Sequence, residues 1–138
     1  MTNPLHIGPL NHVALPSADP EVASRFYCEV LGFEQTARPG FSFRGSWLLN
    51  RATGLMIHLI HDAVFQPDLE SPINTRSSHL AMQTPDYDQA INDLEQHNVG
   101  FVERVLPDYC YRQVFFRDLD GNVLELGEWP SPEEMFPG

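Results

Sequence analysis

The sequence predicts an α+β fold made of two related halves, each of the form βαβββ. One observation is a repeated spacing, because 46 positions separate His12 from His58 and 46 also separate His79 from Glu125. A second is a constant offset of 67 positions between the corresponding members of the two pairs. A third is that each of the four residues lies in a short apolar run typical of a strand. Together these observations indicate a duplicated unit that places a polar residue on the first and last strands of each half.

The first half begins with a strand and a helix. Residues 10–15 form the first apolar run, and Asp19 followed by Pro20 is typical of a helix start, with Asp19 as the N-cap. Val22, Phe26 and Val30 recur at helical spacing and predict the buried face of that helix, which Tyr27 and Leu31 widen. The further strands expected in this half are 33–36, 41–49 and 55–60, and the first module as a whole is expected over residues 8–60.

The second half repeats this order after a linker. Residues 61–77 are rich in turn-forming residues and are expected to join the halves. Asp86 stands 67 positions after Asp19 and opens the second helix, whose core side is expected at Ala90, Ile91 and Leu94. The strands expected here are 78–83, 101–105, 109–117 and 122–127, in a module spanning 78–128. The acidic, Pro-rich tail from Trp129 onward is expected to pack against the body.

Composition limits the functional classes. The 138 residues are expected to form one domain, residues 1–138, with 42% hydrophobic residues and a net charge of −11. All eight cationic residues are Arg, so lysine chemistry and the P-loop are excluded, and the acidic balance argues against nucleic acid and anionic membranes. The sequence contains no apolar run long enough to span a bilayer. It also shows no secretory signal and only two cysteines, so a cytoplasmic location is expected.

Glu125 is the most informative residue, because it is a carboxylate in an otherwise apolar strand. A buried charge needs a cationic partner, either an arginine or a metal. The repeated spacing favours a metal, with His12, His58, His79 and Glu125 as its ligands. Imidazole and carboxylate together suit one divalent transition ion per site, namely Zn, Ni, Fe, Mn or Co. His61 and His97 are expected to play no part in the site.

These motifs resemble the vicinal oxygen chelate superfamily, also called the glyoxalase, bleomycin resistance and dioxygenase family. The resemblance rests on the segments 10–15, 25–33, 78–81 and 115–126, and it covers about residues 8–128. It implies that the two βαβββ modules form a curled, open mixed sheet, that the protein is a homodimer, and that a divalent metal lies in the cleft. The ligand positions of the family fall on the same four residues as the spacing argument.

The resemblance implies a small-molecule substrate with neighbouring oxygens and leaves three activities open. The first is a lyase or isomerase of the lactoylglutathione lyase type, with Glu125 also acting in catalysis. The second is an extradiol ring-cleaving dioxygenase, and the third is a non-catalytic dimer that binds a small molecule such as a drug. His58 departs from the glyoxalase I pattern, which has a second Glu there, and Phe115 departs from the dioxygenase pattern. The residues expected to line the substrate pocket are Phe43, Trp47, Arg76, Tyr111 and Arg112.

Overall fold

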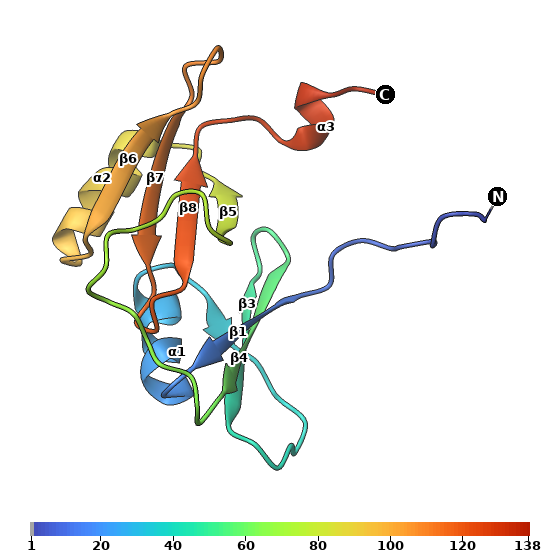
Figure 1. Ribbon diagram of the computed structural model, residues 1–138, viewed down its shortest axis with the longest axis vertical. Coiled ribbons are helices and arrows are strands. Elements are labelled where there is room, and N and C mark those ends of the chain that lie inside the picture. The colour runs from blue at the N-terminus through green and yellow to red at the C-terminus, as the bar shows by residue number, and fades with distance from the viewer. Residues whose placement is uncertain (1) are drawn as a thin grey trace.

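The computed structural model describes residues 2–138 and consists of two βαβββ modules that follow one another along the chain (Figure 1). Each module forms its own four-stranded mixed sheet, in which the first strand pairs in parallel with the last. This arrangement confirms the predicted α+β class and the open, mixed character of the sheets. None of the helices in residues 2–138 is long and apolar enough to cross a membrane.

The first module has the strand order β1-β4-β3-β2. Its elements are β1 (Val13–Ser17), α1 (Pro20–Glu29), β2 (Glu34–Gln35), β3 (Gly45–Asn50) and β4 (Leu55–His61). The second module has the equivalent order β5-β8-β7-β6. Its elements are β5 (Leu80–Gln83), α2 (Tyr87–Gln96), β6 (Phe101–Val105), β7 (Arg112–Arg117) and β8 (Val123–Gly127), and a short α3 (Pro132–Met135) follows.

Both main helices begin at the predicted caps. The Asp19 carboxylate accepts a hydrogen bond from the backbone N–H of Val22, and the Asp86 carboxylate accepts one from that of Gln89, which satisfies N–H groups that the first turn leaves free. The buried face of α1 agrees with the prediction at Phe26 and Tyr27 and differs at Val22. Ala23, Phe26 and Tyr27 are buried and Val22 is exposed.

Several predicted strands begin later in the structure. β1 begins at Val13 and β5 at Leu80, so His12 and His79 each lie one residue before a strand and not on it, in contrast to the prediction. In two further strands, turns replace the first residues. Residues 41–44 form a loop, and β3 begins only at Gly45, where a Cβ would meet the Leu59 carbonyl and the Arg38 guanidinium. Before β7, Asp108 and Cys110 have positive φ angles, which a strand does not accommodate. In contrast, β4 extends through His61, one residue into the predicted linker.

The hydrophobic core lies on one face of each sheet, together with the two helices. Leu48, Ile57 and Leu59 come from the first sheet, and Val114, Phe116 and Leu124 from the second. Both helices lie on the left of the molecule in Figure 1, while the N-terminal arm and α3 project to the right.

A buried polar contact joins the modules. The Tyr27 hydroxyl of α1 donates to Asp118 Oδ2 at 2.6 Å, and the same carboxylate accepts hydrogen bonds from the backbone and side chain of Asn122. Asp120 Oδ1 accepts a bond from the backbone N–H of Ala18. The turn after β7 therefore fixes the position of the second module against the first.

Candidate metal site

The first pair of predicted ligands lies on the sheet face opposite the core. Ala14 pairs with His58, and Trp47 pairs with His58 from the other side, so these residues share one face of the first sheet. The His12 and His58 rings stack with centroids 3.8 Å apart, and Trp47 stacks on His58 at 4.2 Å with an interplanar angle of 4°. The strand register thus produces a row of three rings.

The surroundings of His58 favour the neutral imidazole. Burial lowers its pKa below the ordinary value of 6.5, and the nearby His12 and Arg38 lower it further. Its Nε2 atom is buried and has no hydrogen-bond partner among residues 2–138. A neutral imidazole with an unpartnered nitrogen fits a metal ligand, since the metal would be the missing partner.

The second pair lies on the corresponding face of the second sheet. His79 Nε2 is 3.7 Å from Glu125 Oε2. His79 Nδ1 is 2.7 Å from the Ser77 carbonyl, which only accepts, so Nδ1 carries the proton and Nε2 keeps its lone pair in the neutral ring. A carbonyl that orients a histidine in this way is typical of metal sites.

Gln113 completes the surroundings of Glu125. Its Nε2 donates to Glu125 Oε1 at 2.8 Å and leaves Oε2 directed toward His79. The Glu125 side chain is 4% exposed, and burial raises its pKa above the ordinary value of 4.5, while His79 and Gln113 act in the opposite direction. Within residues 2–138, Gln113 and His79 are the polar side chains in contact with this buried carboxylate, and neither is an arginine.

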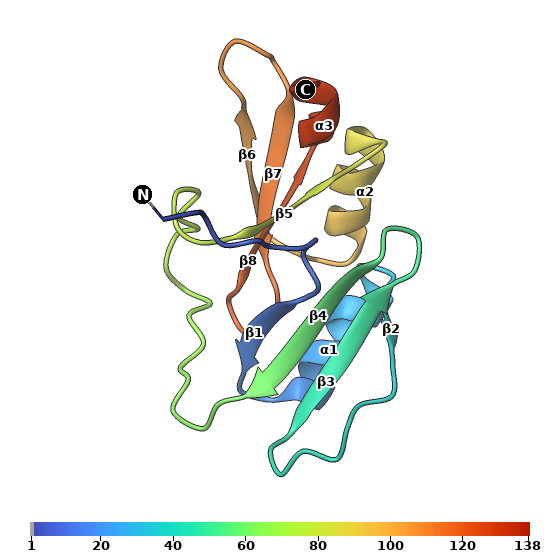
Figure 2. The ribbon, with the colours of Figure 1, turned by 90° about the vertical axis from the view of Figure 1, so that its right-hand side faces the viewer.

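The structure brings the four predicted ligands together only as two pairs. Among residues 2–138, no group of three or more His, Cys, Asp or Glu is close enough to hold a metal. The prediction that one chain gathers all four around one ion is therefore not met. The physical reason is the packing of the modules: they share one core, and the sheet of the second module lies above that of the first in the view of Figure 2, so the two pairs stand on different sheets.

The second pair nevertheless has a spacing that fits a transition metal. Two atoms that bind one ion at about 2.0–2.2 Å lie roughly 3–3.6 Å apart at common coordination angles. The distance of 3.7 Å between His79 Nε2 and Glu125 Oε2 needs only a small adjustment to reach that range. Since neither pair alone supplies the three or four ligands that such ions take, each represents half of a site.

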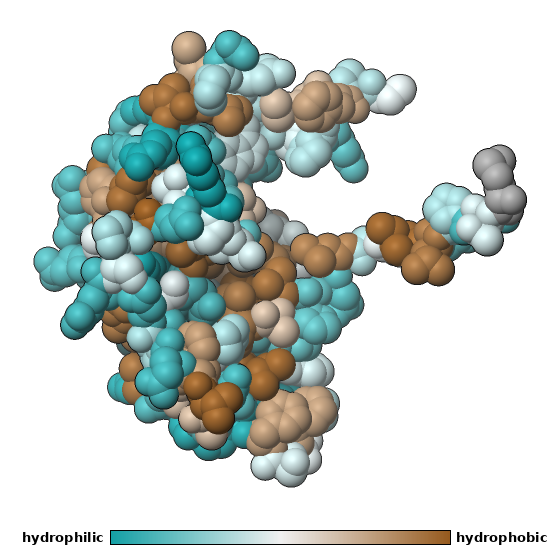
Figure 3. All heavy atoms as spheres, viewed as in Figure 1, coloured by the Kyte–Doolittle hydropathy of each residue, from teal (hydrophilic) through white to brown (hydrophobic). Residues whose placement is uncertain are grey.

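A cavity of about 720 Å³ lies over the second pair. His79, Glu125, Gln113 and Phe115 line its sheet side, and Trp129, Met135 and Phe136 of the C-terminal segment line another wall. Figure 3 shows the molecule hollowed on its right-hand side, between the C-terminal segment and the N-terminal arm. The volume is in the range of small-molecule sites.

The predicted pocket residues are found in different places. Arg76 lines the cavity. Trp47 stacks on His58, and Phe43 stacks on Phe41 beside Arg38. Tyr111 stacks on Tyr109 in the turn before β7.

Arg112 is already paired within the chain. Its guanidinium donates to Glu128 and Asp88 and lies over the Tyr87 ring. Alternation along β7 places it on the face opposite Gln113. Arg112 is therefore paired with acids of the chain and does not line the cavity over the second pair, in contrast to the expectation that it belongs to the substrate pocket.

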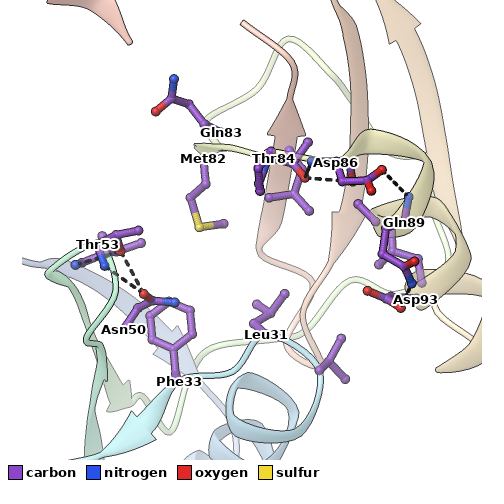
Figure 4. Close-up of a pocket in the computed structure, with 16 residues that line it drawn as sticks. Leu31, Phe33, Asn50, Thr53, Met82, Gln83, Thr84, Asp86, Gln89 and Asp93 are labelled. Atoms are coloured by element: carbon purple, nitrogen blue, oxygen red, sulfur yellow. Dashed lines mark hydrogen bonds between the residues drawn. The ribbon is translucent and has the colours of Figure 1, made fainter. Parts of the chain in front are cut away.

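Another cavity, of about 420 Å³, lies where the modules meet (Figure 4). Leu31 and Phe33 come from the first module, and Met82, Gln89 and Asp93 from the second. None of the predicted ligands lines this cavity. It is separate from the candidate metal site.

Comparison with known proteins agrees with this fold. Residues 9–126 match the family described as the Glyoxalase/Bleomycin resistance protein/Dioxygenase superfamily. The chain is 35% identical over 122 residues to the uncharacterized protein YaeR of Escherichia coli (strain K12), covering 86% of this chain and 95% of that protein. It is 28% identical over 127 residues to glyoxylase I 4 of Arabidopsis thaliana, covering 90% of this chain and 72% of that protein.

Solved structures show the same fold. A glyoxalase family protein from Bacillus anthracis superposes with a TM-score of 0.74 at 22% identity, covering 94% of this chain and 100% of that one. The fosfomycin resistance protein FosX from Listeria monocytogenes gives 0.72 at 20% identity, covering 95% and 100%. With the match over residues 9–126, these comparisons show that the chain belongs to the Glyoxalase/Bleomycin resistance protein/Dioxygenase superfamily.

Proposed function

We propose that the protein is a divalent-metal-dependent enzyme, a lyase or isomerase of the lactoylglutathione lyase type, whose site forms between two copies of the chain. His12 and His58 of one copy would meet His79 and Glu125 of the other around one ion. The observation that carries this proposal is the placement of two half-sites on different sheets of one chain, each with ligand atoms free. The family match and the 28% identity to glyoxylase I 4 support the class of reaction.

Exposed apolar residues support association of two copies. Leu5 and Ile7 of the N-terminal arm are 90% and 89% exposed, and Phe136 near the other end of the chain is 70% exposed. The arm and the C-terminal segment project on the side away from the helices (Figure 1). Exposed apolar residues gathered on one side are typical of an interaction surface.

The ligand set defines what the ion would contribute. Bound Zn, Ni, Fe, Mn or Co would polarise two neighbouring oxygens of a substrate and stabilise the negative charge that develops when a proton leaves carbon. The protein's part is to present neutral imidazoles and one carboxylate. Ser77 fixes the tautomer of His79, and Arg38 helps to keep His58 neutral.

Glu125 is the candidate proton carrier. A carboxyl group moves protons most effectively when its pKa lies closer to the working pH, and burial raises the pKa of Glu125. Gln113 holds Oε1, so Oε2 faces His79 and the ion, and Glu125 would take or return a proton at Oε2 only when that oxygen leaves the ion.

The test combines metal analysis with turnover. Protein purified without added metal, then loaded with Zn or Ni, is assayed with the hemithioacetal of methylglyoxal and glutathione. We expect about one ion per chain, and we expect Glu125→Gln to lose both the ion and the activity. The matched control is His61→Ala, which changes a histidine outside the half-sites and should keep both. Full metal content in Glu125→Gln, or no stoichiometric metal in the wild type, would contradict the proposal.

A further inference from the structure

We infer that the substrate of this site is an organic anion with an apolar body, and that Arg76 and Arg104 bind its negative group. This inference rests on the proposed function, because it concerns the cavity over His79 and Glu125.

The cavity wall has the opposite charge to the rest of the protein. The chain carries 19 acidic residues against eight arginines. Among the residues that line the cavity, however, Glu125 is the only acid, while Arg76 and Arg104 both take part. In a protein of net charge −11, long-range electrostatics would repel an anion, so binding one requires local cations of this kind.

Both guanidinium groups lack a carboxylate partner. Arg44, Arg51 and Arg112 form ion pairs with nearby acids, as expected in an acidic protein. No ion pair to Arg76 or Arg104 is present within residues 2–138, and Arg104 donates only to the backbone carbonyl of Glu103. Most of their N–H donors therefore remain free for a ligand, and a guanidinium matches a carboxylate or phosphate in two parallel hydrogen bonds.

The strand register places Arg104 on the ligand face. Arg104 of β6 pairs with Gln113 of β7, and Gln113 donates to Glu125. Residues directly opposite in an antiparallel pair point to the same side of the sheet. Arg76 belongs to the segment between β4 and β5, three positions before His79, so the two arginines line the same cavity from different elements.

The other walls are apolar. Phe115 and Leu106 come from the sheet and its turn, and Trp129, Met135 and Phe136 come from the C-terminal segment. Such walls favour a hydrocarbon or aromatic body between the anionic group and the oxygens that would chelate the ion. The inferred substrate is thus an amphipathic organic acid; the glutathione hemithioacetal of the turnover assay shares its anionic group and tests the class of reaction, not the apolar body.

The test uses a matched pair of probes, 3-phenylpropionate and 3-phenylpropan-1-ol, which share a body and differ in charge. Binding to the metal-free full-length protein is measured by two-dimensional ¹H–¹⁵N NMR titration. We expect the acid to bind about tenfold or more tightly than the alcohol, because one charge-assisted hydrogen bond contributes a difference of that size in affinity. The acid should also shift the amide signals of Arg104, Gln113 and Glu125. The preference should weaken as the salt concentration rises.

The double variant Arg76→Gln with Arg104→Gln should bind both probes equally, while the control Arg51→Gln, which removes a guanidinium elsewhere, should keep the preference. Equal affinities in the wild type, or a preference that survives the double variant, would overturn the inference. Because this measurement needs no metal, its failure is distinguishable from failure of the proposed function, which is decided by metal content and turnover.

Discussion

Replacing Gln113 with methionine tests how the half-site around Glu125 is built. Gln113 donates one hydrogen bond of 2.8 Å to a carboxylate that is almost fully buried. A hydrogen bond to a charged group contributes about 1.5–3 kcal/mol. Methionine has a similar length and cannot donate, so Glu125 would lose one of its two polar neighbours without a large change in packing. Loss of a residue that orients a metal ligand typically weakens metal binding about 10–100-fold, which agrees with that energy.

The assay is Zn affinity, measured by competition with a chromophoric chelator. The matched control is Gln83→Met, because Gln83 is an exposed glutamine of the same sheet that donates to the Trp129 carbonyl and not to Glu125. We expect Gln113→Met to lose at least tenfold in affinity and Gln83→Met to stay near the wild type. An affinity within about twofold of the wild type for Gln113→Met would refute the claim that this contact positions a metal ligand.

Two further predictions concern the fold and its charges. Tyr27→Phe removes the buried hydrogen bond to Asp118 and should lower the free energy of unfolding in urea by about 1–3 kcal/mol, whereas Tyr109→Phe in an exposed turn should not; equal stabilities would contradict the role of this contact. The ion pair with Arg44 lowers the pKa of Glu21 to about 2, so its contribution to stability is present above pH 4.5 and is lost as the pH falls toward 2. In Arg44→Gln, carboxyl NMR should show the pKa of Glu21 returning toward 4.5, and an unchanged value would argue against the pair.

The fold was predictable because local signals agreed with one another. Asp19 and Asp86 are the helix caps, and the turn Asp118-Leu119-Asp120-Gly121-Asn122 joins two strands. Gly121 has a φ angle of 86°, and because it has no side chain the Asp68 backbone can lie close to it. β3 begins at Gly45 and not at residue 41 as predicted, for a reason that the spacing of hydrophobic residues could not show. Arg38 folds over Phe41 and Phe43 and donates to the Phe43 carbonyl, so these aromatic residues belong to a loop.

The site was predictable only in part, because spacing determines which strand face carries a residue and not where the two modules lie. The repeated interval of 46 correctly joined His12 with His58 and His79 with Glu125, since each interval links strands that pair in one sheet. Nothing in the spacing specifies how the modules pack against each other. Gln113 was missed for a related reason: its contact with Glu125 follows from the pairing of Phe115 with Glu125, which appears only once β7 and β8 are aligned.

The central claim is that the metal site is shared between two copies, and mixing two inactive variants tests it most directly. His58→Ala lacks one half-site and Glu125→Gln lacks the other, so neither should bind metal alone. If two chains exchange halves, a mixed dimer contains one intact site, and refolding the variants together in equal amounts should restore about a quarter of the wild-type metal content and activity. Complete absence of metal and activity in the mixture, with both single variants folded and dimeric, would show that each site belongs to one chain and would contradict this account.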